Sequence, residues 1–211
     1  MNKFGNFLWR SAFSIVFGWY YKTKVYGRDE FPKEGPVIVV PNHLSNFDPP
    51  VLGYAIPRHA HFMAKAELFV NPISRFFCTW LGAFPVHRGT VDKIAIRHAM
   101  GLLKHKEVLG IFAEGSRQKP GKLGRFHDGA ASIALRTGVG IVPIATIGTY
   151  DIQRHGVAII IGDLIPVRKD KATAENIKAV NETVKSAIQR MIDDYESGRY
   201  EHTPYRSGFM L

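Results

Sequence analysis

The stretch PVIVVPNHLSNFDPP, residues 36–50, places an apolar β-branched run directly before a polar turn and a proline-marked helix start. Residues 36–41 predict a strand, because β-branched side chains favour extended backbone. Asp48 followed by Pro49 predicts a helix, with the aspartate as its cap and the proline at its first position. A strand that leads at once into a helix is the repeating unit of an α/β fold.

The same alternation continues along the chain. Further strands are predicted over 59–64, 83–88, 107–115, 139–146 and 157–167. Helices are predicted over 49–56, 90–106, 128–138 and 172–195, and a helical segment follows the 59–64 strand through residue 81. In the helix predicted over 90–106, Thr90 can serve as the cap and Asp92 suits the first turn. The last helix carries apolar residues three or four positions apart: Ile177, Val180, Val184, Ile188, Met191 and Tyr195. We therefore expect one α/β domain over residues 25–200, with a central, mostly parallel sheet flanked by helices, and a C-terminal tail over 201–211.

Composition limits the class of protein. The 211 residues suffice for one hydrophobic core, and 45% hydrophobic against 22% charged residues is typical of a folded chain. Cys78 is the one cysteine, which excludes an intrachain disulfide and a cysteine-based zinc site, and its apolar neighbours predict a core position. The formal net charge of +10 attracts polyanions: nucleic acid, an anionic membrane face or phosphorylated substrates.

The N-terminal stretch 4–21, FGNFLWRSAFSIVFGWYY, is rich in aromatic side chains and is divided by Arg10. Its uncharged part, 11–21, is shorter than the roughly 20 residues that a spanning helix needs. Bulky residues around Trp19 stand where a signal peptide would have a small-residue cleavage site. We expect residues 1–24 to form an aromatic-rich amphipathic helix at the membrane interface, with a helix packed on the protein's own core as the alternative.

His43 and Asp48 lie five positions apart in the loop after the first predicted strand. A histidine at a strand end can present one ring nitrogen to a cleft, and a carboxylate bound to its other nitrogen fixes the tautomer and stabilises the imidazolium. Ser45 lies nearby but belongs to no G-x-S-x-G elbow. The pair is therefore a candidate general base for a substrate hydroxyl, and helix capping by Asp48 is the structural alternative.

Two later stretches, FPVHRG (84–89) and IFAEGSRQ (111–118), each place an arginine just after a β run. Arg88 and Arg117 are candidates for a phosphate clamp because guanidinium groups make forked bonds to anions, and ordinary surface arginines are the alternative. Glu114 would bind substrate hydroxyls or hold the arginines. The basic, glycine-rich stretch 119–131 leads into a predicted helix whose first amides suit an anion.

Together these stretches resemble the glycerolipid acyltransferase family, and specifically its 1-acyl-sn-glycerol-3-phosphate acyltransferases. NHLSNFD (42–48) matches the family's N-H-x-x-x-x-D block, FPVHRG resembles the arginine block, FAEGSR (112–117) resembles F-P-E-G-T-R, and IVPI (141–144) resembles the proline block. The blocks occur in the family's order, and the resemblance covers roughly residues 25–170. The chain departs from the pattern at Ala113, Ser116 and His87, which replace a proline, a threonine and an acidic residue.

The resemblance implies transfer of a fatty acyl group from acyl-CoA or acyl carrier protein to the free sn-2 hydroxyl of 1-acyl-glycerol-3-phosphate, which forms phosphatidic acid. His43 would be the general base and Asp48 would orient it. The substrate supplies the nucleophile, so no serine or cysteine nucleophile, metal or other cofactor is implied. The substrate-binding residues implied by the arginine and glutamate blocks are Arg88, Glu114, Gly115, Ser116 and Arg117.

The implied partners are the lipid bilayer, lysophosphatidic acid and the acyl donor, and the implied location is the cytoplasmic face of the cell membrane, peripheral or monotopic. The basic excess would hold the protein on anionic lipid. Another lysophospholipid is the alternative acceptor.

Two other classes of protein remain as alternatives. A metal-dependent hydrolase would use His43 and Asp48 with His59 and His61, which lie two apart in a predicted strand and so point to the same face. A non-catalytic basic protein would bind membrane or nucleic acid. We expect no nucleic-acid partner, because the sequence has no recognition helix, RNP-like motif or zinc finger.

Overall fold

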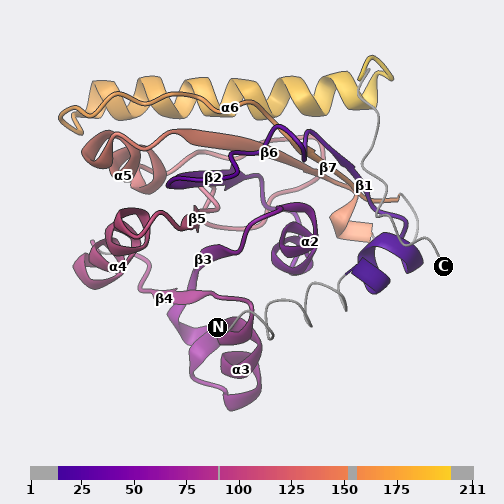
Figure 1. Cartoon of the computed structure of the whole chain (residues 1–211), viewed down its shortest axis with the longest axis horizontal. Coiled ribbons are helices and arrows are strands. Elements are labelled where there is room, and N and C mark those ends of the chain that lie inside the picture. Colours follow the sequence, from indigo (N-terminus) through magenta and orange to yellow (C-terminus); the bar gives the residue numbers. More distant parts are fainter. Residues whose placement is uncertain (1–13, 90, 152–155, 201–211) are drawn as a thin grey trace.

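The computed structural model describes residues 14–89, 91–151 and 156–200, which fold around one seven-stranded sheet (Figure 1). The strands lie in the order β1 (Lys24–Tyr26), β7 (Ala158–Ile161), β6 (Ile141–Ile147), β2 (Val37–Pro41), β5 (Val108–Gly110), β3 (Ala60–Lys65) and β4 (Phe84–Val86). Neighbours from β6 to β4 pair in parallel, whereas β7 is antiparallel to β6 and parallel to β1. The predicted α/β domain with a mostly parallel sheet is confirmed.

Helices cover both faces of the sheet, and each face has its own apolar core. On one face α4 (Lys93–Lys104), α5 (Gly129–Thr137) and α6 (Ala174–Glu196) pack over the sheet, and on the other face α2 (Asp48–Ala55) does so (Figure 1). The predicted stripe of α6 is confirmed, since Val184 and Ile188 are buried and the other members pack against the same core. Gly138 ends α5 in the left-handed conformation, with φ of 73°, as its position predicted.

The connection from β3 to β4 stands away from the sheet. It holds a 3₁₀ turn, η2 (Ala66–Phe69), and α3 (Pro72–Trp80), which lies apart from the other helices in Figure 1. None of the side chains of α3 is buried. The predicted core position of Cys78 is therefore wrong: within the described part of the chain α3 packs mainly against η2, which leaves the thiol half-buried, and this partial burial raises the pKa of Cys78.

Two local predictions differ from the structure, and two elements were not predicted. The strand expected over 107–115 ends at Gly110, and the chain then turns, with the Gly115 amide donating to the Phe112 carbonyl at 3.0 Å. The side chain of Asp92 caps α4 by accepting from the amides of Ile94 and Ala95, while Thr90 lies outside the described residues. β1 and the short 3₁₀ turn η3 (Thr149–Asp151) were not predicted.

The N-terminal segment is described from residue 14 onward. A π-helical turn, η1 (Ser14–Tyr20), packs beside α2, and Phe17 is buried in the core on that face while Tyr20 is exposed. The rest of the interfacial helix predicted for residues 1–24, and the tail over 201–211, lie outside the described residues. Within the described ranges, no helix combines the length and the apolar character that crossing a bilayer requires.

Candidate active site

Hydrogen bonds fix the backbone at the end of β2, just before His43. Asn42 follows the strand and is buried, and its side-chain amide donates to the carbonyl of Thr146 at 3.0 Å. In return the Thr146 amide donates to Oδ1 of Asn42 at 2.6 Å. These bonds join the ends of β2 and β6 across 104 residues of sequence, so the chain leaves the sheet in a fixed direction just before His43.

His43 and Asp48 form the predicted pair. Nδ1 of His43 lies 2.7 Å from Oδ2 of Asp48, whose side chain is fully buried. The same oxygen accepts from the amides of Leu44 and Ser45, at 2.7 and 2.8 Å. Because a carboxylate only accepts, Nδ1 carries the proton and Nε2 is the basic nitrogen of the ring.

Asp48 does not cap its helix, contrary to the prediction. α2 begins at Asp48 itself, the cap position is Phe47, and no side chain caps this helix start. An aspartate cap would accept from the second or third amide of its helix, but Pro50 has no amide hydrogen and the Val51 amide donates to the Phe47 carbonyl at 3.1 Å. The carboxylate turns back onto the preceding loop instead, and there it holds His43.

Aromatic stacking sets the plane of the imidazole. The ring of His43 stacks on Phe112, with centroids 4.2 Å apart, and Phe112 stacks on Phe62 at 5.4 Å. Only 14% of the His43 side chain remains exposed. No signal in the sequence pointed to this role, because Phe112 is one of several apolar residues in the run that precedes Glu114.

Glu114 ties the third motif to His43. It is 2% exposed, and its two oxygens accept from the backbone amides of His43, at 3.0 Å, and Gly124, at 2.7 Å. Burial raises the pKa of Glu114, and the two amide bonds oppose that shift. The described contacts of Glu114 are thus with backbone rather than with the arginines, and they join the His43 loop to the basic stretch 119–131.

The turn after Glu114 also contacts His43. The Gln118 amide donates to the His43 carbonyl at 2.8 Å, which places the exposed Arg117 one residue from this contact. Ser116 is exposed, and its hydroxyl accepts from the Gln118 side chain at 3.2 Å. Gly115 has φ of +65°, and a Cβ atom there would lie 2.9 Å from the His127 ring.

Gly115→Ala is expected to destabilise the protein by about 1–2 kcal/mol from the left-handed backbone alone, with a further loss from the contact with His127. Urea unfolding measures the loss. Gly121→Ala is the matched control, because Gly121 also has a positive φ, of +75°, but has open space where its Cβ would lie. Equal losses for the two variants would show that the His127 contact has no role.

A cavity of about 830 Å³ opens beside the His43–Asp48 pair. That volume suits a small-molecule or lipid ligand. Its lining is mostly apolar and comes from α2, β3, α3 and the turn after β5; it includes His43, Pro49, Phe62, Met63, Phe77, Arg88 and Phe112. Among the described residues, the lining thus brings His43 and Arg88 to one space but does not include Arg117.

A second histidine–aspartate pair lies next to Arg88. Nδ1 of His87 is 2.9 Å from Oδ2 of Asp92, and the same oxygen accepts from the His87 amide at 3.0 Å. Bonds from the amide of Ala95, from the amide of His87 and from the His87 ring hold the pKa of Asp92 well below its usual range. The His87 side chain is 75% exposed, so this pair fastens the start of α4 at the surface.

The metal-site alternative rested on His59 and His61. Their rings meet edge to face with centroids 4.7 Å apart, so the two do share a side of the chain, and Nδ1 of His61 lies 3.2 Å from the Gly82 carbonyl oxygen. Burial lowers the pKa of His61. Within the described ranges, no three histidine, cysteine or acidic side chains are grouped as metal ligands.

Comparison with known proteins places this arrangement in a family. Residues 22–147 match the family model described as Acyltransferase. The chain is 33% identical to the chloroplastic 1-acyl-sn-glycerol-3-phosphate acyltransferase LPAT1 of Arabidopsis thaliana, over 73% of this chain and 44% of that protein. It is 28% identical to the 1-acyl-sn-glycerol-3-phosphate acyltransferase of Bacillus subtilis (strain 168), over 86% of this chain and 96% of that protein.

A solved structure agrees with the sequence comparisons. The crystal structure of the 1-acyl-sn-glycerophosphate (LPA) acyltransferase PlsC from Thermotoga maritima superposes with a TM-score of 0.72 and 26% identity, over 92% of this chain and 79% of that one. The chain spans about half the length of several curated relatives that it matches. The family model nevertheless covers more than half of the chain and includes every predicted site residue, so this protein belongs to the acyltransferase family.

Proposed function

We propose that this protein transfers a fatty acyl group from an acyl thioester to the sn-2 hydroxyl of 1-acyl-glycerol-3-phosphate and so forms phosphatidic acid. The observation that carries the proposal is His43, which lines an apolar cavity together with Arg88 and is held by Asp48 through a 2.7 Å contact. The names of the relatives support the acyltransferase class and the phosphorylated acceptor.

The geometry suits general base catalysis. Nε2 of His43 takes the proton of the acceptor hydroxyl while the hydroxyl oxygen attacks the thioester carbonyl carbon. When the tetrahedral intermediate collapses, the carbon–sulfur bond breaks and the leaving sulfur takes the proton back from His43. Asp48 stabilises the imidazolium that exists between these two transfers. The acceptor supplies the nucleophile, so the protein needs none of its own.

The cavity offers separate places for the parts of a lysophospholipid. Apolar side chains such as Phe62, Met63 and Phe77 suit an acyl chain, because its transfer from water into an apolar space is favourable. Arg88 lies on the same lining and is exposed, so it can meet a phosphate without a large desolvation cost.

The remaining features of the proposal concern the surroundings of the enzyme. Acyl-CoA or acyl carrier protein is the co-substrate, and no metal or other cofactor takes part. The protein sits on the cytoplasmic face of the cell membrane as a peripheral or monotopic protein, where the N-terminal segment 1–24 and the net charge of +10 favour anionic lipid. It takes no nucleic acid as a partner.

The proposal is tested by mass spectrometry of the products that the purified full chain forms from acyl-CoAs of graded length. Lysophosphatidic acid and several other lysophospholipids are offered as acceptors, and acyl carrier protein thioesters as the second donor. We expect phosphatidic acid as the main product. Faster transfer to an acceptor without a terminal phosphate monoester would move the assignment to another lysophospholipid, and no acylated product from any pair would contradict the proposal.

Arg88→Ala and Arg117→Ala are each expected to raise the KM for lysophosphatidic acid roughly ten- to hundredfold with little change in kcat, because a hydrogen bond to a charged group contributes about 1.5–3 kcal/mol. Steady-state kinetics against acceptor concentration measure the change. Arg168→Ala is the matched control, an exposed arginine near Ile165, which pairs with the opposite end of β6. An unchanged KM in either site variant would remove that arginine from the clamp.

A further inference from the structure

Helix α3 carries its large apolar side chains on one face, because Ile73, Phe76, Phe77 and Trp80 recur three or four positions apart. Its sequence, PISRFFCTW, contains one charged residue, Arg75, and none of its side chains is buried. The apolar face of an amphipathic helix normally packs against other protein or lies in the lipid interface. The apolar face of α3 thus needs a covering that the described part of the fold does not supply.

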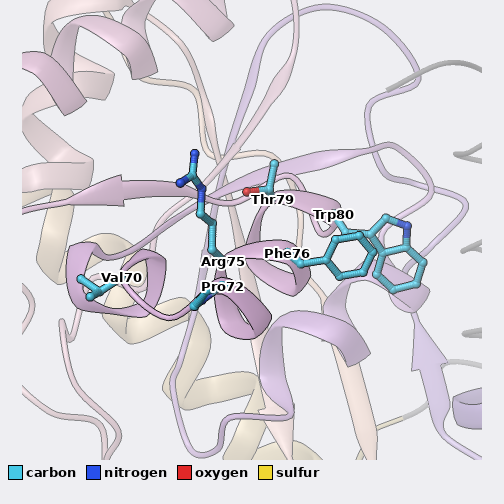
Figure 2. A pocket seen from close by; sticks show the side chains of 6 residues that line it. All are labelled: Val70, Pro72, Arg75, Phe76, Thr79 and Trp80. Carbon is cyan, nitrogen blue, oxygen red and sulfur yellow. The ribbon is translucent and has the colours of Figure 1, made fainter.

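The two sides of α3 face different spaces. On the inner side Ile73, Phe77 and Cys78 line the cavity that contains His43. On the outer side Val70, Phe76 and Trp80 line a hollow of about 640 Å³, together with Pro72, Arg75 and Thr79 (Figure 2). Val70 is 81% exposed and Phe76 is 64% exposed. The helix is therefore a thin wall between the cavity and the outside of the molecule.

Most of the exposed apolar residues follow the carboxyl ends of the parallel strands. Strands β2, β3 and β4 run in the same direction as β5, so their carboxyl ends meet at one edge, where His43 also lies. The segments that follow these ends carry most of the large apolar side chains that are exposed in the described part of the chain: Phe47, Leu68, Val70, Ile73, Phe76, Phe77, Val91 and Ile94. We call these eight residues the apolar rim.

The charges near the rim favour an anionic surface. Arg75 lines the outer hollow, and Lys65 and Arg88 line the cavity. Glu67 is the acidic residue of η2, and its carboxylate is paired with Lys65 at 3.1 Å. Aromatic side chains beside a basic residue are the combination that favours the boundary between lipid headgroups and acyl chains.

We propose that the apolar rim docks on the surface of an anionic lipid bilayer, with α3 at the headgroup boundary, so that the acceptor enters the cavity past α3 without leaving lipid. This inference rests on the proposed function for the identity of the lipid in the cavity. The bilayer is favoured as the occupant because the rim is continuous with a cavity that takes a lipid, and because the basic groups beside it complement anionic headgroups.

The first test is flotation of the full chain with vesicles of phosphatidylcholine and phosphatidylglycerol. The variant Val70→Gln with Phe76→Gln is expected to bind roughly tenfold more weakly, because two exposed apolar groups lose their burial in lipid. Leu164→Gln is the matched control: Leu164 is 47% exposed, but it precedes Ile165, which pairs with Ile141 at the far end of β6. The control is expected to float like the wild type.

Equal flotation of the double variant and the wild type would overturn the proposal. So would a loss of flotation that accompanies a change in oligomeric state by analytical ultracentrifugation, since a second copy of the chain would then be the occupant. Loss of vesicle binding by a monomer with an unchanged circular dichroism spectrum supports the bilayer.

A second measurement does not depend on the double variant. Replacing Trp9 and Trp19 with phenylalanine leaves Trp80 as the one tryptophan of the chain. Its fluorescence is expected to be quenched by vesicles whose lipids carry bromine on their acyl chains, because Trp80 lines the outer hollow. Emission that brominated vesicles leave unchanged would contradict the docking of α3.

Activity separates this inference from the proposed function. Val70 and Phe76 do not line the cavity of His43, so the double variant is expected to keep wild-type turnover on a short-chain acceptor dissolved as monomers and to lose it on acceptor held in vesicles. Equal loss on both acceptors would contradict a docking role. If the wild type acylates neither acceptor, the proposed function fails, while flotation and quenching still decide whether the rim binds lipid.

Discussion

His43→Ala is expected to lower kcat for acyl transfer roughly 10²–10⁴-fold, the range that general base catalysis contributes, while the fold stays intact. Among the described residues, the ring makes one side-chain hydrogen bond, to Asp48, and stacks on Phe112, so its removal takes away the base without breaking the backbone bonds of the loop. Those bonds run from the His43 amide to Glu114 and from the Gln118 amide to the His43 carbonyl. Steady-state kinetics and circular dichroism together measure the effect.

The chain contains its own control for this experiment. His87 is also paired through Nδ1 with an aspartate five positions later, but its side chain is 75% exposed and fastens the start of α4. His87→Ala is therefore expected to keep wild-type kcat. If purified His43→Ala kept wild-type turnover, the general-base mechanism would be wrong, and a large loss of kcat in both variants would show that the pairing rather than the place at the cavity matters.

The central sheet was predictable from the sequence because its strands are buried apolar runs. Residues of β2 and β6 are nearly all fully buried, and such strands show up as continuous runs of Val and Ile. β1 has only three residues, too few to show the alternation of apolar and polar side chains that marks a strand. Its place at the edge of the sheet is set by pairing with β7, more than 130 residues later in the chain. Pairing over that distance leaves no local signal.

Burial was harder to predict than secondary structure. Apolar neighbours suggested a core position for Cys78, yet α3 stands outside the two packed layers and none of its residues is buried. Local sequence reports that a helix is apolar but not whether protein covers it. The apolar rim could not be predicted for the same reason, because its residues come from three separate segments that only the parallel strand order brings to one edge.

The motif residues of the candidate site were predicted from the sequence, but the residues that hold them in place were not. His43, Asp48 and Arg88 were named from short patterns; the structure pairs His43 with Asp48 and places His43 and Arg88 on the lining of one cavity. The bonds that hold the loop run from Asn42 to Thr146 and from Glu114 to Gly124, and neither pair is visible as a motif. Glu114 was expected to contact substrate or arginines because its charge suggested so, whereas two backbone amides occupy its oxygens.

Asp48→Asn is expected to lower both stability and turnover. Oδ2 of Asp48 accepts three hydrogen bonds, from the His43 ring and from the amides of Leu44 and Ser45. The asparagine oxygen can take that place, which turns the side-chain NH₂ group toward the buried position of Oδ1. Oδ1 has no hydrogen-bond partner among the described residues, so the NH₂ group would be left unsatisfied at a cost of about 1–3 kcal/mol.

The effect of Asp48→Asn on turnover has a separate cause. A neutral amide no longer stabilises the imidazolium that forms when His43 takes the proton, so kcat is expected to fall roughly 10²–10⁴-fold, as for loss of the base itself. Asp92→Asn is the matched control, because it removes the charge from the surface pair with His87 and weakens the cap of α4. Urea unfolding and steady-state kinetics of both variants separate the two effects: both are expected to lose stability, but only Asp48→Asn is expected to lose kcat. Wild-type turnover in Asp48→Asn would show that the carboxylate only holds the loop, and that His43 works without its charge.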